Sequence, residues 1–298
     1  MSTVTVHLMG GMANQMFQYA AGLALARRTG SGLVLDTRWQ ATAPIEREHG
    51  LRAFALPDQV RATGRRPWQV PKALRRLPGV SRMLGGAARH GLYVVTCREA
   101  VHHFDPEFFD LRPPCEIKGY FQSALYFEGV EAELRSRFEA IPMLSAPAAE
   151  WAARIRQTSQ SIAVHVRGGD YLRQPKGAPL APLNSSYYKQ ALRVMQGLLG
   201  QTAEVFVFTD DTRHAAQVLP AGMAVQMVET PADRPWEDMH LISLCAHAII
   251  ANSSFSWWGA WLNSREDKIV VAPRDWFTAS SMRDKNSCDV YPAGWILV

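Results

Sequence analysis

The opening stretch of the sequence, residues 3–36, reads TVTVHLMGGMANQMFQYAAGLALARRTGSGLVLD and decides the fold class. Its first residues are rich in β-branched side chains and stop at Gly10-Gly11, as a short strand followed by a glycine turn would. Residues 14–28 have the apolar period of a helix, and residues 32–36 form a second apolar strand. This order predicts a βαβ unit and therefore a parallel sheet.

The same alternation returns in the second half of the chain. Helical patterns there separate five short apolar stretches with the character of strands: 161–166, 204–208, 224–229, 248–251 and 268–272. This pattern describes a doubly wound α/β domain. The prolines in the segment 142–147 indicate a linker. We therefore expect one α/β domain over 1–150 and a second over 151–298, with the final residues packing back on the first domain.

The composition is that of a globular protein, but the charge is unevenly distributed. Hydrophobic residues make up 47% of the 298 residues and charged residues 20%, which excludes a disordered chain. The net charge is +5, yet residues 59–98 hold nine Lys or Arg and no acidic residue, so the remaining 23 basic and 27 acidic residues carry −4. Apolar and basic side chains recur near helical spacing over 70–89. This pattern fits either a solvated helical face or a helix lying on an anionic membrane.

The cysteines and the N-terminal sequence favour the cytoplasm. The four cysteines form no CxxC pair and give no disulfide framework: Cys97, Cys115, Cys245 and Cys288. The first residues lack the charged and apolar regions of a signal peptide, and the longest apolar stretch, 241–251, is too short to span a bilayer. We expect a cytoplasmic protein, with peripheral contact at the inner membrane through residues 59–98 as the alternative to a purely soluble one.

Candidate binding residues follow the predicted strands, because ligands of open α/β sheets bind at the carboxyl ends of strands. In HVRGGDY at 165–171, His165 and Arg167 alternate and so share a face, and the Arg167 guanidinium suits phosphate oxygens. The competing interpretation is a turn held by an ion pair between Arg167 and Asp170. Asp210 follows the next strand and suits a base, a ribose or a metal, whereas Asp211 equally suits the cap of the following helix.

Two further turns have similar character. The residues Asn252, Ser253, Ser254 and Phe255 open a helix, where hydroxyls and free N–H groups favour an anion, although a plain N-cap followed by core tryptophans is the alternative. The turn that contains Gly10 and Gly11 lacks GxGxxG spacing and a Walker lysine, which argues against a dinucleotide oxidoreductase. Together these turns predict a nucleotide diphosphate held without a dedicated metal site.

Six stretches carry a family resemblance: GGMANQMFQYAAGLALA at 10–26, GYFQSALYF at 119–127, HVRGGDY at 165–171, FTDD at 208–211, EDMHLISLCAHAIIANSSFSWWGAWLN at 237–263 and VVAPRDWF at 270–277. In these stretches the chain resembles the bacterial α-1,2-fucosyltransferases, glycosyltransferase family 11. The resemblance implies a GT-B-like fold of two facing Rossmann-type domains with parallel sheets. The first domain would be on the acceptor side, and the second would bind GDP-fucose. It also implies inversion at the fucose anomeric carbon, with no essential metal or other cofactor.

The resemblance assigns roles to particular residues. It implies that Arg167 holds the diphosphate and stabilises the leaving group, that His165 lies beside the nucleotide, and that Asp210 contacts the guanosine. It places Asn252, Ser253, Ser254 and Phe255 around the phosphates, and Gly10, Gly11, Asn14 and Gln15 in the acceptor-side cleft. The family usually has a second arginine where this chain has Gly168. The general base is left open between Asp170, which is the nearest motif carboxylate, and Glu46, Glu48 and His49.

The expected activity is transfer of L-fucose from GDP-fucose to the 2-hydroxyl of a terminal β-galactoside on an oligosaccharide, with no nucleic-acid partner. Two alternatives stay open. One is a fucosyltransferase of another linkage, such as α-1,3. The other is a GDP- or glycan-binding protein that has lost catalysis, for which Gly168 is the only support.

Overall fold

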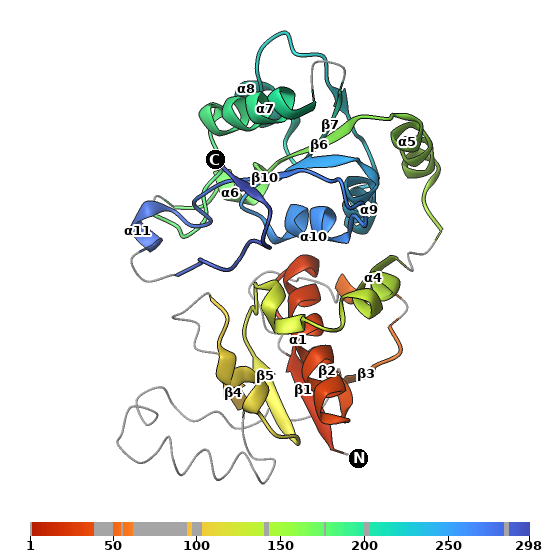
Figure 1. The fold of residues 1–298 in the computed structure, drawn as a ribbon, viewed down its shortest axis with the longest axis vertical. Coiled ribbons are helices and arrows are strands. Elements are labelled where there is room, and N and C mark those ends of the chain that lie inside the picture. The colour runs from red at the N-terminus through yellow and green to blue at the C-terminus, as the bar shows by residue number, and fades with distance from the viewer. Residues whose placement is uncertain are drawn as a thin grey trace. The chain divides into compact units, whose positions relative to one another are not determined.

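The computed structural model describes residues 2–38, 50–54, 56–61, 94–96, 103–139, 143–175, 177–199, 203–282 and 286–298. The chain divides into two compact units, which Figure 1 shows with their elements labelled. The first comprises Met1–Arg137 and Ser287–Val290, and the second comprises Phe138–Asn286 and Tyr291–Val298. The final residues are therefore shared, because 287–290 belong to the first unit and 291–298 to the second.

The division lies between Arg137 and Phe138, earlier than the boundary expected at residue 150. The segment expected to be a linker instead leads into helix α5 (Ala146–Gln157), which has Pro147 in its first turn. Proline is well tolerated there, because the first N–H groups of a helix have no intrahelical partner. Ser145 caps α5 and also binds the buried Glu237, with its N–H at 2.7 Å and its hydroxyl at 2.6 Å from the carboxylate. These bonds tie the segment to the second unit.

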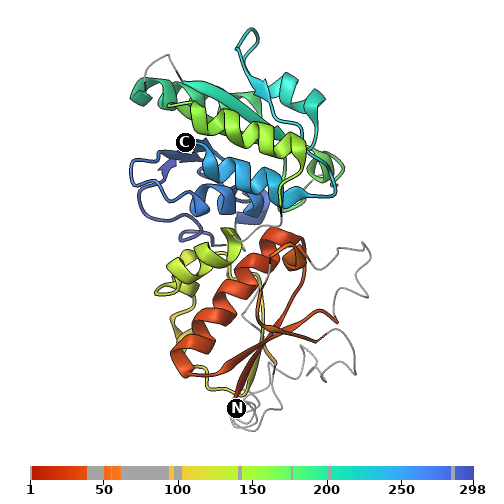
Figure 2. The ribbon, with the colours of Figure 1, turned by 90° about the vertical axis from the view of Figure 1, so that its right-hand side faces the viewer.

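The first unit is built on a five-stranded parallel sheet in the order β3-β2-β1-β5-β4. Its strands are β1 (Thr3–His7), β2 (Gly32–Asp36), β3 (Gln59–Arg61), β4 (Val94–Thr96) and β5 (Cys115–Lys118). Helix α1 (Met12–Thr29) connects β1 to β2, which confirms the predicted βαβ unit, and Figure 2 shows it in red along the sheet. Gly22 permits this packing, since a Cβ there would lie 2.2 Å from Cγ2 of Val6.

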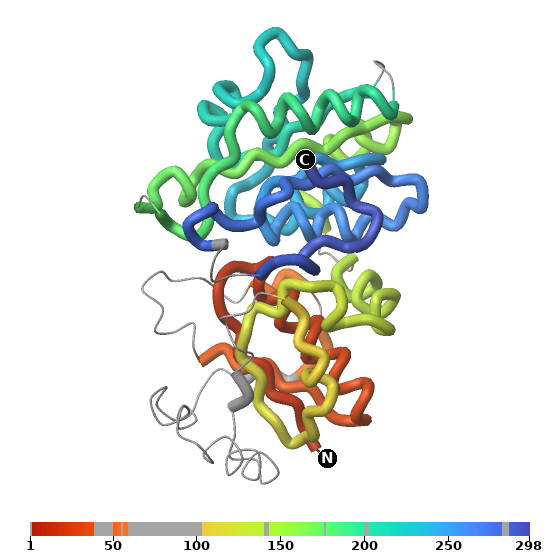
Figure 3. The backbone as a smooth tube through the Cα atoms, turned by 60° about the vertical axis from the view of Figure 1, so that its left-hand side comes forward, coloured from red at the N-terminus to blue at the C-terminus, as the bar shows by residue number. Residues whose placement is uncertain are grey.

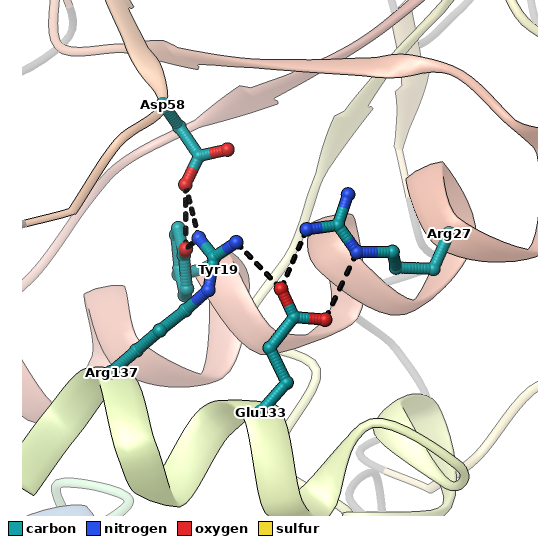
Figure 4. A network of polar contacts seen from close by, with 5 residues as sticks. All are labelled: Tyr19, Arg27, Asp58, Glu133 and Arg137. Carbon is teal, nitrogen blue, oxygen red and sulfur yellow. Dashed lines mark hydrogen bonds and ion pairs between the residues drawn. The ribbon is translucent and has the colours of Figure 1, made fainter.

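Short elements complete the first unit: the 3₁₀ turns η2 (Gly50–Ala53), η3 (Pro106–Asp110) and η4 (Ala124–Phe127), and most of helix α4 (Glu131–Glu139). A polar network, drawn in Figure 4, holds α4 on α1. Arg137 bonds the Tyr19 hydroxyl, the Asp58 carboxylate at 2.7 Å and Glu133 at 2.6 Å. Glu133 in turn receives two hydrogen bonds from Arg27, at 2.6 and 2.9 Å. This network holds α4 in the first unit up to Arg137, the last residue of α4 that belongs to this unit.

The second unit holds a six-stranded parallel sheet in the order β11-β10-β9-β6-β7-β8. Its strands are β6 (Ser161–Val166), β7 (Glu204–Thr209), β8 (Gln226–Met227), β9 (His247–Ile249), β10 (Val270–Ala272) and β11 (Ile296–Leu297). The helices are α5, α6 (Gly169–Leu172), α7 (Ser185–Leu199), α8 (Thr212–Val218), α9 (Pro235–Leu244), α10 (Ser254–Leu262) and α11 (Ala279–Met282). The α/β fold with parallel sheets predicted from the sequence is thus confirmed. The strand expected at 224–229 is shorter than predicted and covers only Gln226–Met227. The C-terminal residues, dark blue in Figure 3, form β11, an additional strand that pairs with β10.

Helices α7 and α8 cover one face of the second sheet, and α9 and α10 cover the other (Figure 1). The first face is packed by alternate residues of β6 and β7 against Tyr188 and Leu192 of α7. On the other face, α10 carries Trp257 and Trp258, both fully buried. Gly259 brings α10 close to α9, since a Cβ there would meet Cγ2 of Ile242 at 2.5 Å. Among the described residues, no helix combines the length and hydropathy that a membrane crossing requires.

Candidate active site at the carboxyl edge of the second sheet

The predicted donor-binding residues gather because three strands that are separate in sequence are neighbours in the sheet. Strand β6 lies between β7 and β9, and all three run parallel. Their carboxyl ends therefore meet at one edge. The chain leaves this edge through Arg167 after β6, Asp210 after β7 and Asn252 after β9.

Arg167 is held by two carboxylates. Its Nη2 lies 2.6 Å from the Asp170 carboxylate and its Nη1 lies 2.6 Å from the Asp210 carboxylate. Its guanidinium carbon also lies 5.4 Å from the centre of the Tyr171 ring. The Arg167 side chain is 28% exposed and that of Asp170 is 38% exposed, so both can meet a ligand. The ion pair between Arg167 and Asp170 that was predicted to hold a turn is therefore present, and it is formed by residues of the candidate site.

Asp210 and Asp211 are adjacent, but Asp210 binds the loop after β6 and Asp211 caps helix α8. Asp210 accepts a hydrogen bond from the Gly168 N–H at 2.8 Å while it binds Arg167, so it holds both the loop and the guanidinium. A Cβ on Gly169, whose φ is +23°, would lie 2.3 Å from the Asp210 carboxylate, so the loop needs glycine there. Asp211 caps α8 and accepts from the His214 N–H at 2.9 Å, as the capping interpretation predicted.

The residues after β9 form a capped helix start. The Ser253 hydroxyl accepts from the Phe255 N–H at 3.4 Å, so it serves as the N-cap of α10. The Asn252 amide donates to the carbonyls of Ala181 at 3.1 Å and Trp276 at 3.3 Å. Ser254 and Phe255 lie in the first turn of α10 and are half-buried. The structure brings Asn252, Ser253, Ser254 and Phe255 to the same edge as Arg167 and Asp210.

Three tyrosine hydroxyls fix the backbone of this edge. Tyr188 donates to the His165 carbonyl at 3.2 Å, Tyr187 donates to the Ile250 carbonyl at 2.5 Å, and Tyr171 donates to the Asn252 carbonyl at 3.2 Å. Tyr187 and Tyr188 lie on α7 and are buried. Hydroxyl groups of α6 and α7 thus hold the strand ends that carry the candidate residues.

His165 is buried as a neutral imidazole. Its side chain is almost fully buried, and its ring lies 5.5 Å from the Phe255 ring, centre to centre. Burial, and to a smaller extent the charge of Arg167, lower the pKa of His165 from 6.5 to about 3. His165 therefore offers hydrogen bonds rather than positive charge near neutral pH.

Buried polar atoms without a hydrogen-bond partner concentrate around this edge. Six side-chain atoms in the described ranges are buried and unpartnered: His165 Nδ1, Arg167 Nε, His214 Nε2, Asn252 Oδ1, Trp236 Nε1 and Asp289 Oδ1. The first four belong to residues at, or packed against, the ends of β6 and β9. Buried polar groups are nearly always paired, so such a concentration is typical of a ligand site. His214 was not predicted from the sequence, because it lies on a helix, one turn past the FTDD motif.

The four residues predicted to line the acceptor-side cleft lie in the first unit, around the turn between β1 and α1. Gln15 is fully buried, and its amide donates to the Gly10 carbonyl and accepts from the Gly50 N–H, each at 2.9 Å. These bonds show that Gln15 holds the turn between β1 and α1, and its assignment to the acceptor-side cleft stays a prediction. Asn14 accepts from the Gln122 amide at 2.9 Å. Gly10 has a φ of +75°, which requires glycine, and both Gly10 and Gly11 are half-buried.

Some predicted features lie outside the described residues. These include the candidate bases Glu46, Glu48 and His49 and, except for strands β3 and β4, the basic segment 59–98. Within the described ranges, no three His, Cys, Asp or Glu side chains are grouped so as to hold a metal ion.

Comparison with known proteins identifies the family. The model of glycosyl transferase family 11 matches residues 106–298. The chain is 28% identical to an alpha-1,2-colitosyltransferase of Escherichia coli over 100% of this chain and 99% of that protein. It is 27% identical to galactoside alpha-(1,2)-fucosyltransferase 1 of Saimiri boliviensis boliviensis, over 87% of this chain and 65% of that protein. Among solved structures, fucosyltransferase NodZ from Bradyrhizobium is 18% identical with a TM-score of 0.48, covering 87% of this chain and 92% of that chain. The family expected from the sequence motifs is confirmed, and the chain belongs to glycosyl transferase family 11.

Proposed function

We propose that this protein transfers L-fucose from GDP-fucose to the 2-hydroxyl of a terminal β-galactoside on an oligosaccharide, with inversion at the fucose anomeric carbon. The observation that carries the donor part is the cluster of unpartnered buried atoms at the carboxyl edge of the second sheet. The α-1,2 linkage is supported by the names of the colitosyl- and fucosyltransferase relatives.

In this proposal Arg167 binds the diphosphate. Its guanidinium is paired with Asp170 and Asp210, so binding of GDP-fucose would exchange carboxylate partners for phosphate oxygens of similar geometry. The Nε of Arg167 is unpartnered and offers a further donor. During transfer, the bond between the anomeric carbon and the phosphate oxygen breaks, and negative charge develops on the departing GDP. Arg167 would stabilise that charge more strongly than the charge of the bound donor.

The neutral His165 would support the nucleotide beside Phe255 without adding charge. The acceptor 2-hydroxyl attacks the anomeric carbon from the face opposite the phosphate, and its proton passes to a base. Asp170 is the candidate base in the second unit, because its carboxylate is partly exposed and would be released when Arg167 turns to the phosphates. No metal or other cofactor has a role in this scheme.

The E. coli relative favours a second candidate, transfer of colitose with the same α-1,2 linkage, because the similarity extends over both whole chains. The two candidates share the donor-phosphate site and differ in the sugar pocket. Transfer with another linkage, such as α-1,3, and GDP binding without catalysis are outcomes that the same experiment detects.

The test uses the purified full chain with GDP-fucose and lactose or lacto-N-biose. We expect acceptor-dependent GDP release, with NMR showing the new bond at the 2-position of galactose. Arg167→Ala should abolish transfer while the protein stays folded. Arg173→Ala, which removes an exposed arginine close by, is the matched control and should retain activity. Full activity of Arg167→Ala would refute the phosphate role, and GDP binding without turnover on any donor would favour the non-catalytic alternative.

We also propose, from charge alone, that the basic segment 59–98 contacts anionic membranes. Co-sedimentation with phosphatidylglycerol vesicles should occur at low salt and fall as salt is raised. No binding at low salt would refute this proposal.

A further inference from the structure

His214 lies directly on the loop that carries Arg167. It occupies the third position of helix α8, and its N–H is held by the Asp211 cap at 2.9 Å. A Cβ on Gly168 would lie 3.1 Å from His214 Cδ2 and 2.9 Å from Asp211 Cβ. These distances show that His214 and Asp211 occupy the space that a side chain at position 168 would need.

The free nitrogen of His214 is next to this contact. Nε2 is bonded to Cδ2 within the imidazole ring, so it lies close to Gly168. It is buried and has no hydrogen-bond partner among the described residues. The Nε of Arg167, one residue away along the loop, is also buried and unpartnered. Two buried nitrogens without hydrogen-bond partners therefore belong to residues at this loop, one from the end of β6 and one from α8.

The carboxylates around the loop would repel a bound diphosphate, and His214 could offset part of this repulsion. The Arg167 guanidinium is bonded to Asp170 and Asp210, and Asp211, whose Cβ lies next to Gly168, is a third acidic residue at the loop. A diphosphate approaching Arg167 would be repelled by these carboxylates. A further N–H donor beside the loop would offset part of that repulsion, since hydrogen bonds to charged groups are stronger than neutral ones.

We propose that His214 is a donor-binding residue whose Nε2–H donates a hydrogen bond to the diphosphate, and that Gly168 is required so that the imidazole can lie against the loop. The inference rests on the proposed function, because it assigns a residue to the same donor site. It extends the site from the three strand ends to helix α8.

A pair of variants separates hydrogen bonding from packing. His214→Leu keeps a side chain of similar bulk and removes the N–H, whereas His214→Gln keeps an amide N–H. Calorimetry with GDP should show affinity about 10- to 100-fold weaker for His214→Leu, as for loss of a hydrogen bond to a charged group, with much of the affinity kept by His214→Gln. Arg213→Ala, which removes an exposed positive charge from the same helix, is the control and should bind GDP nearly as the wild type does.

Guanosine and inorganic pyrophosphate complete the test. His214→Leu should leave guanosine binding unchanged and should weaken competition by pyrophosphate against GDP. Unchanged GDP affinity in His214→Leu would overturn the inference, and so would equal losses for GDP and guanosine, which would mean that His214 only packs the loop. Absence of GDP binding by the wild-type protein would instead refute the proposed function, so the two failures are distinguishable. Thermal melting of each variant confirms that the fold is retained.

Discussion

Acidification should destabilise this protein through His165, and the size of the effect follows from its burial. The folded protein holds His165 neutral, with a pKa of about 3, whereas the unfolded chain exposes an ordinary imidazole with a pKa of 6.5. Below the higher value the unfolded chain binds a proton that the folded protein excludes. The free energy of unfolding therefore falls as the pH is lowered through the window between the two values.

The magnitude can be worked out from the two pKa values. Near pH 5 the unfolded imidazole is almost fully protonated and the folded one is neutral, which costs about 2 kcal/mol of stability relative to neutral pH at about 1.4 kcal/mol per pH unit. The test compares urea unfolding of the wild type and His165→Phe, without GDP, at both pH values. Phenylalanine keeps an aromatic ring against Phe255 and removes the titrating nitrogens.

Tryptophan fluorescence is a suitable signal, because Trp257 and Trp258 are buried in the helix that also carries Phe255. Burial also lowers the pKa values of His240 and His247, but both histidines are present in the two proteins and their effects cancel in the difference. We expect the wild type to lose about 2 kcal/mol more than His165→Phe on acidification. Equal losses would refute the neutral buried imidazole, and with it the role of His165 as an uncharged support for the nucleotide.

Three further predictions follow from contacts described above. Glu237→Gln should lower the free energy of unfolding by about 3 kcal/mol, because its buried carboxylate accepts two hydrogen bonds from Ser145; a loss in urea unfolding below about 1 kcal/mol would contradict this. Tyr187→Phe should cost about 1 kcal/mol by removing the bond to the Ile250 carbonyl, and hydrogen exchange should show faster opening at the end of β9, whereas unchanged exchange would count against the bracing role. Treatment with EDTA should leave the rate of GDP release unchanged, because Arg167 and His214 supply the proposed phosphate contacts; activity that returns only with added Mg²⁺ would show that a metal is needed.

The alternation of strands and helices was predictable from the sequence because each strand of the second sheet is a short apolar run with a clear end. Strand β6 (Ser161–Val166) matches its predicted bounds. Helix α5 was not predicted, since Pro147 has the same appearance in a linker as in the first turn of a helix. Periodicity shows where elements lie, but it does not distinguish these two uses of proline.

In the candidate site, too, some features could be predicted from the sequence and others depend on tertiary contacts. Arg167 and Asp210 were identifiable because each follows a strand, yet their ion pair depends on β6 and β7 being neighbours, which chain order alone does not give. Gln15 belongs to a specific motif, but its burial shows that it supports a turn. His214 has no motif signal, and only the tertiary contact with Gly168 brings it to the site.

The division of helix α4 has a practical consequence for engineering chimeras within the family. Arg137 is fixed to Tyr19 and Asp58 of the first unit, whereas the next residue, Phe138, packs edge-on against Trp258 of the second at 5.4 Å. Two adjacent residues of one helix thus contact different units. In a chimera joined at residue 150, Phe138 and Trp258 would come from different parents. A chimera that exchanges the first unit should be joined between residues 137 and 138. It should also carry residues 287–290 from the same parent, because Asp289 accepts the Phe104 N–H at 2.7 Å.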